Sequence, residues 1–132
     1  MKAKKTRYSC YNLNYHLVWI PKYRRKILTG NIAKRLSELL RETAKSNEIE
    51  ILNESIQPDH VHLFVSAPPR LSPAKIVNIF KGFTGRRLRQ EFIFLLKHHR
   101  ERLWTRTYYV GTAGSVSAET IQNYIQEQEG NF

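Results

Sequence analysis

The chain has 132 residues, enough for one domain with a substantial hydrophobic core but too few for a second independent one. Lys and Arg number 22 against 11 Asp and Glu, which gives a formal charge of +11 and a pI of ≈ 10.0 and indicates a polyanionic partner. The single cysteine, Cys10, excludes an intrachain disulfide and a cysteine-based zinc cluster, and it fits a reducing cytosol.

The N-terminus is basic, but no apolar segment of signal-peptide length follows it, and no stretch approaches about 18 continuous apolar residues. We therefore expect a cytoplasmic protein without a membrane partner. The charge is unevenly distributed: residues 107–132 contain three Glu and no Lys or Arg, so residues 1–106 carry 22 basic and eight acidic side chains, a formal +14. A phosphate-binding surface is expected in residues 1–106, apart from the final helix.

The first half of the chain alternates between strand and helix patterns. Residues 11–20 are rich in Tyr, Leu, Val, Trp and Ile and end at a proline, which predicts a strand. Residues 31–45 place apolar side chains at helical spacing with charges between them, which predicts an amphipathic helix packed on a sheet. Residues 47–57 alternate as a second strand, and a Pro-Asp turn leads into a third at 60–66.

The second half is predicted to contain a helix, a strand and a last helix. A Ser-Pro pair at 72–73 predicts a helix start, with Ser as the cap, and the helix is expected to run to about Phe94 with some weakness at its two glycines. Residues 103–110 contain Trp, Thr, Tyr and Val and predict a fourth strand. Residues 111–115 predict a flexible joint, and Ser117 opens a last helix of about a dozen residues.

The predicted order is strand, helix, strand, strand, helix, strand, helix. It indicates a single α+β domain over residues 1–132, a ferredoxin-like or RRM-like split βαβ fold. Its antiparallel sheet would carry helices on one side and an added C-terminal helix. RNA-recognition modules share this skeleton, so the fold alone does not separate binding from catalysis.

His60 and His62 are the most informative residues. Side chains alternate along a strand, so both imidazoles point to the same face, where they form half of a possible metal site. The alternative is a pair of surface or core histidines on an ordinary strand. His16 is expected to be structural, and Asp59 already has a turn to form, although it could orient a histidine.

Tyr124 and Gln128 stand four residues apart in the predicted last helix and therefore share a face. They supply a possible nucleophile and a possible third metal ligand. Tyr124 could instead be a core aromatic beside Ile121 and Ile125. A buried glutamine at the neighbouring position weakens that alternative, because its amide needs hydrogen-bond partners.

Clusters of basic side chains interleave with aromatic ones such as Tyr23 and Phe83, a pattern that suits binding of single strands. Each cluster alone is equally consistent with a solvated face. The run Lys97–Arg102 predicts a solvated loop that touches the nucleic-acid backbone. The candidate nucleic-acid-binding residues are Lys4, Lys5, Arg7, Lys22, Arg24, Arg25, Lys81, Arg86 and Arg87.

Five blocks occur together in one order. They are Tyr15 to Arg25, His60-Val61-His62, Lys81-Gly82, Trp104, and Tyr124 with Gln128. In these blocks the chain resembles the single-tyrosine transposases of the HUH superfamily (the IS200 type), which move small insertion sequences as single-stranded DNA.

The resemblance implies that Tyr124 forms a 5′-phosphotyrosine link and leaves a free 3′-OH, so that no ATP is needed. It also implies recognition of DNA hairpins at the ends of the element, a homodimer with active sites shared between chains, and a tyrosine helix laid over the histidines. His60, His62 and Gln128 would hold a divalent ion, Mn²⁺ or Mg²⁺, since mixed nitrogen and oxygen ligation suits the first and the second is abundant.

Two alternatives stay open. A domesticated relative that acts at repeated palindromes of its host genome would share every catalytic residue. A non-catalytic ferredoxin-like module would bind single-stranded nucleic acid equally well without Tyr124 or a metal.

Overall fold

The computed structural model describes residues 3–5, 10–11, 13–112 and 118–128. The strands are β1 (Lys4–Lys5), β2 (Cys10–Tyr11), β3 (Asn14–Trp19), β4 (Glu50–Gln57), β5 (His60–Ser66) and β6 (Tyr109–Thr112). The helices are η1 (Lys22–Arg24), α1 (Gly30–Ser46), α2 (Pro73–Glu91), η2 (Ile93–Leu95), α3 (Leu96–His99) and α4 (Ala118–Glu127).

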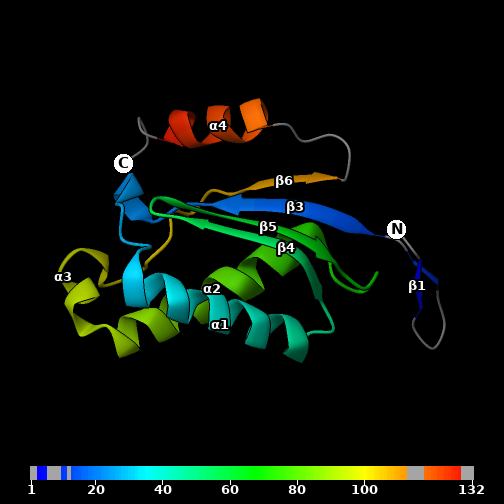
Figure 1. The fold of residues 1–132 in the computed structure, drawn as a ribbon, viewed down its shortest axis with the longest axis horizontal. Coiled ribbons are helices and arrows are strands. Elements are labelled where there is room, and N and C mark those ends of the chain that lie inside the picture. Colours follow the sequence, from blue (N-terminus) through cyan, green and yellow to red (C-terminus); the bar gives the residue numbers. More distant parts are fainter. Residues whose placement is uncertain (1–2, 6–9, 12, 113–117, 129–132) are drawn as a thin grey trace.

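One antiparallel sheet of four strands, in the order β4-β5-β3-β6, organises the molecule (Figure 1). The long helices α1 and α2 cover one face and α4 lies over the other. The two central strands are β5 and β3. The chain passes from β3 through α1 to the edge strand β4, and from β5 through α2 to the other edge strand, β6. This is the split βαβ arrangement, which confirms the predicted fold class.

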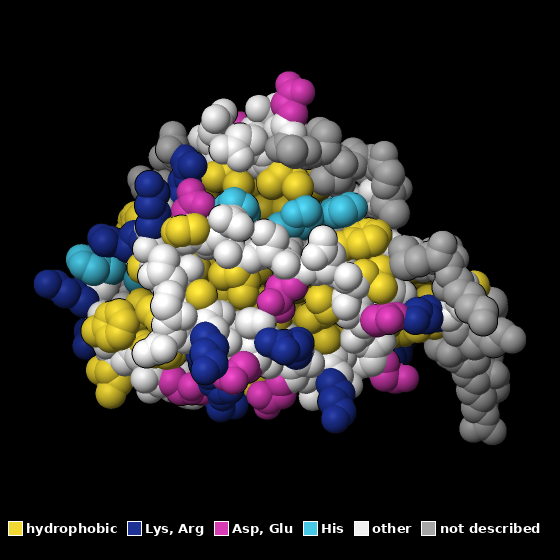
Figure 2. Space-filling model, viewed as in Figure 1, with side chains coloured by type: hydrophobic (Ala, Val, Ile, Leu, Met, Phe, Trp, Pro, Cys, Tyr) yellow, Lys and Arg dark blue, Asp and Glu magenta, His cyan; other side chains and the backbone are white. Residues whose placement is uncertain are grey.

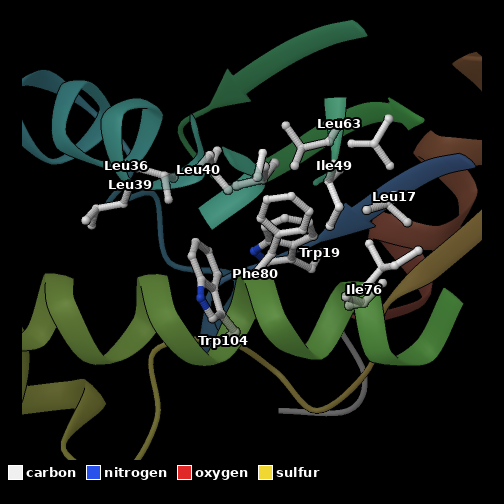
Figure 3. Packing of buried hydrophobic residues seen from close by; sticks show 14 of the residues in the cluster. Leu17, Trp19, Leu36, Leu39, Leu40, Ile49, Leu63, Ile76, Phe80 and Trp104 are labelled. Carbon is white, nitrogen blue, oxygen red and sulfur yellow. The ribbon is translucent and has the colours of Figure 1, made fainter. Parts of the chain in front are cut away.

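The main core lies between the sheet and the two long helices (Figure 3). Alternation along β5 sends Val61, Leu63 and Val65 to this face, where each is fully buried. They meet the leucine stripe of α1 and Phe80 of α2, and Trp19 of β3 stacks on Phe80 at 6.2 Å between ring centroids. At the start of α2, the predicted cap is present, with the Ser72 hydroxyl accepting from the backbone N–H of Lys75 at 3.1 Å.

A second, smaller cluster lies on the opposite face of the sheet. Val18 and Ile20 point away from the main core and pack against Tyr124 and Ile125 of α4, with Tyr109 and Ile121 at its border. Tyr124 is 9% exposed and Ile125 is 1% exposed. Burial of this apolar patch is what places α4 on its own sheet.

The fourth strand differs from the prediction for 103–110, because β6 begins at Tyr109. Within the described residues 103–108, Trp104 makes an isolated bridge in place of a ladder. Its indole turns into the core instead, where Nε1 donates to Thr84 Oγ1 at 3.1 Å. Gly85 makes room for the ring, since a Cβ there would lie 3.3 Å from the indole.

Two other strands are shorter than predicted. The strand expected at 11–20 is β3, and residues 10–11 pair instead with β1 in a separate two-stranded sheet. The strand expected at 47–57 begins at Glu50 and has a register shift between Ile51 and Asn53, a β-bulge. The third strand has the predicted bounds.

The end of α2 and the segment after it also differ from the prediction. The helix ends at Glu91 rather than near Phe94, and a 3₁₀ turn follows. The run Lys97–Arg102 begins in α3 and is not a solvated loop throughout, because His99 is only 2% exposed. Burial, followed by the nearby charge of Arg25, lowers the pKa of His99 to about 4.

The predicted joint at 111–115 falls partly in β6, since Gly111 and Thr112 belong to the strand. Its remaining residues, and Ser117, lie outside the described part of the chain. Among the helices that the structure describes, none is both long enough and apolar enough to cross a bilayer.

Candidate active site

His60 stands at the start of β5, directly after the turn that contains Asp59. Its Nδ1 lies 2.9 Å from Asp59 Oδ1, and the other carboxylate oxygen accepts a hydrogen bond from Arg24 Nε at 3.0 Å. Burial acts to raise the pKa of Asp59, but the hydrogen bonds from His60 and Arg24 outweigh it and lower the pKa overall. The carboxylate therefore stays ionised and orients the imidazole, leaving Nε2 available to a ligand.

His62 shares a hydrogen bond with His16 of the neighbouring strand, at 3.0 Å between Nε2 and Nδ1. The His16 ring stacks on Phe64 at 4.3 Å between centroids. Burial, followed by the charges of His16 and His60, lowers the pKa of His62, and burial also lowers that of His16. His62 is thus held in the neutral form that a metal ligand requires.

The histidines and Tyr124 lie on the same face of the sheet. His62 pairs with Val18 in the antiparallel register, so their side chains share a face, and Val18 packs against Tyr124. Figure 2 shows histidine side chains gathered in a band just below α4. The face opposite the main core therefore carries both halves of the predicted site.

Thr107 brings Tyr124 and Gln128 together. Its hydroxyl donates to Gln128 Oε1 at 2.7 Å and lies 3.2 Å from the Tyr124 hydroxyl. A threonine hydroxyl has one proton, so Tyr124 must be the donor in the second bond. Burial raises the pKa of Tyr124, against the smaller opposing effect of its hydrogen-bond partners Thr107 and Thr105. In this arrangement the phenol is protonated.

Lys81 of α2 contacts the backbone of the segment that carries Thr107. Its ammonium donates to the carbonyl oxygens of Thr105 at 2.6 Å and Thr107 at 3.1 Å. Burial, and then the charge of Arg102, lowers its pKa to about 8. Lys81, predicted as a DNA-binding residue, thus ties α2 to the segment that carries Thr107.

The donor set fits a divalent ion in chemistry. His60 has the carboxylate partner that ligating imidazoles commonly use, His62 is neutral, and Gln128 offers an amide oxygen. Among the described residues, no group of three or more His, Cys, Asp or Glu side chains is arranged to hold a metal. The two imidazoles would therefore need the amide, or the substrate, to complete a coordination sphere.

A pocket of ≈ 420 Å³ opens beside this network. Thr107 and Gln128 line it, together with Lys22 and Tyr23 of the η1 turn. The pocket brings basic side chains next to the candidate nucleophile.

The other predicted DNA-binding residues are dispersed. Arg7 and the side chain of Lys5 lie outside the described part, and Lys4 forms an ion pair with Glu50 of β4. Arg87 pairs with Glu91 at 3.1 Å. Lys22 and Arg24 lie in η1 and Arg25 directly follows it, whereas Arg86 lies on α2 together with Lys81 and Arg87.

Thr107 was not among the residues selected from the sequence. It is one threonine in a run of β-prone residues, and its role depends on Tyr124, which is 17 positions away. The partnership of His16 with His62 spans 46 positions and follows only from the pairing of β3 with β5.

Fold and site together define a small split βαβ domain that presents a histidine pair and a buried tyrosine on the α4 face of its sheet. The chain belongs to the IS200-like transposase family, since residues 9–128 match the family described as "Transposase IS200 like". This confirms the resemblance seen in the sequence.

The chain is also similar in sequence to individual transposases. The chain is 36% identical over 129 residues to ISDra2 transposase TnpA of Deinococcus radiodurans, covering 97% of this chain and 92% of the relative. It is 33% identical over 124 residues to the transposase for insertion sequence element IS200 of Salmonella typhimurium, covering 93% and 79%.

Solved structures show the same fold. A crystal structure of a candidate transposase from Deinococcus radiodurans r1 aligns with a TM-score of 0.87 at 36% identity, covering 95% of this chain and 97% of that one. A REP-associated tyrosine transposase bound to a REP hairpin aligns with a TM-score of 0.58 at 12% identity, covering 92% and 67%. At that identity the second likeness concerns the fold alone.

Proposed function

We propose that this transposase cleaves and rejoins single-stranded DNA at the hairpin-bearing ends of an insertion sequence, with Tyr124 as the nucleophile. The observation that carries the proposal is the common location of Tyr124, Gln128 and the histidine pair on the α4 face of the sheet. A buried tyrosine hydroxyl needs a hydrogen-bond partner in any role, so the shared face of Tyr124 and the histidines, and not its bond to Thr107, favours a nucleophile.

The proposed cleavage reaction begins with the phenol oxygen of Tyr124. The Tyr124 oxygen attacks phosphorus, the bond from phosphorus to the 3′-oxygen breaks, and the products are a 5′-phosphotyrosine and a free 3′-OH. The 3′-oxygen takes up a proton as it leaves, and the phenol loses one. Attack by a 3′-OH on the phosphotyrosine reverses these steps and joins strands, so the energy of the phosphodiester bond is conserved.

The phenol has to lose its proton to react. In the arrangement seen here its proton is directed at Thr107, and burial raises the pKa of Tyr124. We infer that the hydroxyl leaves Thr107 when DNA is bound, so that its proton passes to another acceptor as the bond to phosphorus forms.

A divalent ion, Mg²⁺ or Mn²⁺, held by His60, His62 and Gln128 would neutralise charge on the phosphoryl oxygens and fix the scissile phosphate. Asp59 would keep His60 oriented toward it. Gln128 would have to exchange its bond with Thr107 for the ion, so the same hydroxyl holds two groups that the reaction requires.

The nucleic-acid partner is proposed from charge and from family. Basic side chains at the η1 turn and on α2 provide phosphate contacts, and a homodimer that shares its active sites is proposed from the family resemblance. In the described structure α4 packs on its own sheet, so an exchange of helices would break the cluster around Tyr124.

The proposal is tested with labelled single-stranded hairpin DNA from the ends of the element. The wild type with Mg²⁺ or Mn²⁺ should form a covalent adduct that mass spectrometry maps to Tyr124. Tyr124→Phe should fold and bind the hairpin but form no adduct, while Tyr108→Phe serves as the matched control and should still cleave. An adduct at Tyr108 or Tyr109 would reject the assignment.

A further inference from the structure

The η1 turn has an unusual backbone. Tyr23 and Arg24 adopt φ values of 64° and 50°, so two consecutive residues with side chains lie in the left-handed region. Such a conformation persists only where the surroundings enforce it, and it is concentrated at functional sites. Here the N–H of Lys22 donates to Leu103 O and that of Arg24 donates to Pro21 O, both at 2.8 Å.

The consequence is that the Tyr23 ring is presented outward. It is 46% exposed, among the most exposed large apolar side chains that the structure describes. Two cations flank its ring: Lys22 Nζ at 5.1 Å and Arg25 Cζ at 5.8 Å from the centroid. An exposed ring between basic groups is the arrangement that stacks unpaired bases in single-strand binding proteins.

The ring forms part of the wall of the ≈ 420 Å³ pocket beside Thr107 and Gln128. Arg102 and Arg106 also line this pocket, with Glu101 as the carboxylate of the set. Together with Lys22 they give three cations against one anion. A volume of this size falls in the range of about 300–1,000 Å³ that small ligands occupy.

The basic lining continues beyond the pocket. Arg102 and Arg106 also border a second pocket of ≈ 310 Å³, which Lys81, Arg86 and Arg89 line from α2. Residues 102–106 therefore form a strap that borders both basic pockets. A phosphate backbone that crosses this strap would meet cations along its way.

We propose that the first pocket binds the unpaired nucleotide that adjoins the scissile phosphate, with its base stacked on Tyr23 and its phosphate held by Arg102 and Arg106. This subsite rests on the proposed function, because it derives its importance from the phosphate that Tyr124 attacks. It makes Tyr23 a residue that positions single-stranded DNA, a role assigned from its exposure and its place beside Gln128.

The turn also links this subsite to the candidate metal ligands. Arg24 donates to Asp59, whose second oxygen orients His60. Tyr23 directly precedes Arg24 in the chain. A base stacked on Tyr23 is thus held one residue from the arginine that bonds the Asp59 carboxylate. The scissile phosphate would be placed relative to the histidines by backbone and ion-pair contacts instead of by a mobile loop.

The test uses the full chain with Tyr124→Phe and with chelator, so that binding is measured without cleavage. The probe is an unstructured oligothymidylate with one 5-iododeoxyuridine, which cross-links under light to a stacked aromatic ring. We expect the adduct to map to Tyr23. This protein lacks only the Tyr124 hydroxyl, so the proposed subsite is intact. Adducts at other aromatic residues with none at Tyr23 would therefore overturn the proposal.

Variants give an independent measurement of affinity for the same oligonucleotide. Tyr23→Phe keeps the ring and should bind as before, whereas Tyr23→Asn removes it while tolerating the left-handed backbone, and should weaken binding roughly 5- to 150-fold. Arg106→Gln should weaken binding and reduce its salt dependence, while Arg70→Gln, which removes an equal charge beyond the other end of β5, should change it less. Equal affinity of the Tyr23→Phe and Tyr23→Asn proteins would reject base stacking.

The two proposals fail separately. Cross-linking at Tyr23 in a protein whose wild type forms no tyrosine adduct would leave the subsite standing and reject the transposition chemistry. A Tyr124 adduct together with an unaffected Tyr23→Asn protein would do the reverse.

Discussion

The Thr107 hydroxyl is predicted to hold α4 in place. Thr107→Val keeps the shape of the side chain and removes its hydroxyl, which bonds Gln128 Oε1 at 2.7 Å and lies 3.2 Å from both the Tyr124 hydroxyl and Thr105 Oγ1. Gln128 is 7% exposed and Tyr124 is 9% exposed, so water replaces the lost hydroxyl only in part. Leaving buried polar groups without a partner costs ~1–3 kcal/mol.

A cost of about 2 kcal/mol corresponds to a roughly 30-fold change in an opening equilibrium. We expect the amide protons of α4 to exchange faster by about that factor in Thr107→Val, while those of α1 and β5 stay as protected as before, because the main core is untouched. Hydrogen exchange followed by mass spectrometry measures both regions in one experiment.

Thr43→Val is the matched control, because the Thr43 hydroxyl is also buried but donates to Leu39 O within α1. It should leave the exchange of α4 unchanged. If α4 exchanges at the wild-type rate in Thr107→Val, the hydroxyl network does not hold the helix, and the inference that Tyr124 must leave Thr107 before it reacts loses its basis.

Four further predictions concern the site and its surroundings. His60→Ala and His62→Ala should each abolish cleavage, and chelator should do the same to the wild type, with recovery on addition of Mn²⁺ or Mg²⁺; full cleavage in excess chelator would exclude a metal role. Because the pKa of Lys81 is lowered to about 8, the unfolded chain binds more protons above that pH. The wild type should therefore gain stability relative to Lys81→Met as pH rises from 8 to 10.5, and parallel urea stability curves would contradict this. Phosphate contacts by Lys22, Arg86, Arg102 and Arg106 should give a slope of about −3 for log affinity against log salt, at about 0.7 per contact, and a slope near zero would reject the basic surface. Finally, a purified heterodimer of Tyr124→Phe with His62→Ala should regain cleavage if the helices are exchanged between chains, and should stay inert while binding hairpin DNA if each site is built from one chain.

The predictions from sequence succeeded where local patterns decide the structure. The alternation of β5 gave its bounds to the residue, because Val61, Leu63 and Val65 are buried and the residues between them are not fully so. The same alternation placed His60 and His62 on one face. The Ser72 cap likewise follows from local hydrogen bonding.

Tertiary packing decided the rest. Residues 103–108 have high strand propensity, but Trp104 is drawn into the space that Gly85 leaves open, which no local pattern reveals. The bulge in β4 shifts the alternation between Ile51 and Ile56, so the strand has no single period.

The site was anticipated only in part for the same reason. Spacing along one helix or strand relates Tyr124 to Gln128 and His60 to His62. The contacts of Thr107 and His16 with those residues cross between elements, and they become visible only when the sheet and α4 are assembled.

The two clusters of buried residues differ greatly in size, and the small one is the sole apolar anchor of α4 among the residues that the structure describes. The sheet with α1 and α2 is therefore a stable core structure, and α4 is a separately attached element. A truncated chain ending at Thr112 should keep the four-stranded scaffold and its basic surface but lose the proposed nucleophile, Tyr124. Such a fragment would make a natural starting point for engineering, since a different C-terminal helix grafted onto the bare Val18 and Ile20 surface could equip the same DNA-binding platform with another chemistry.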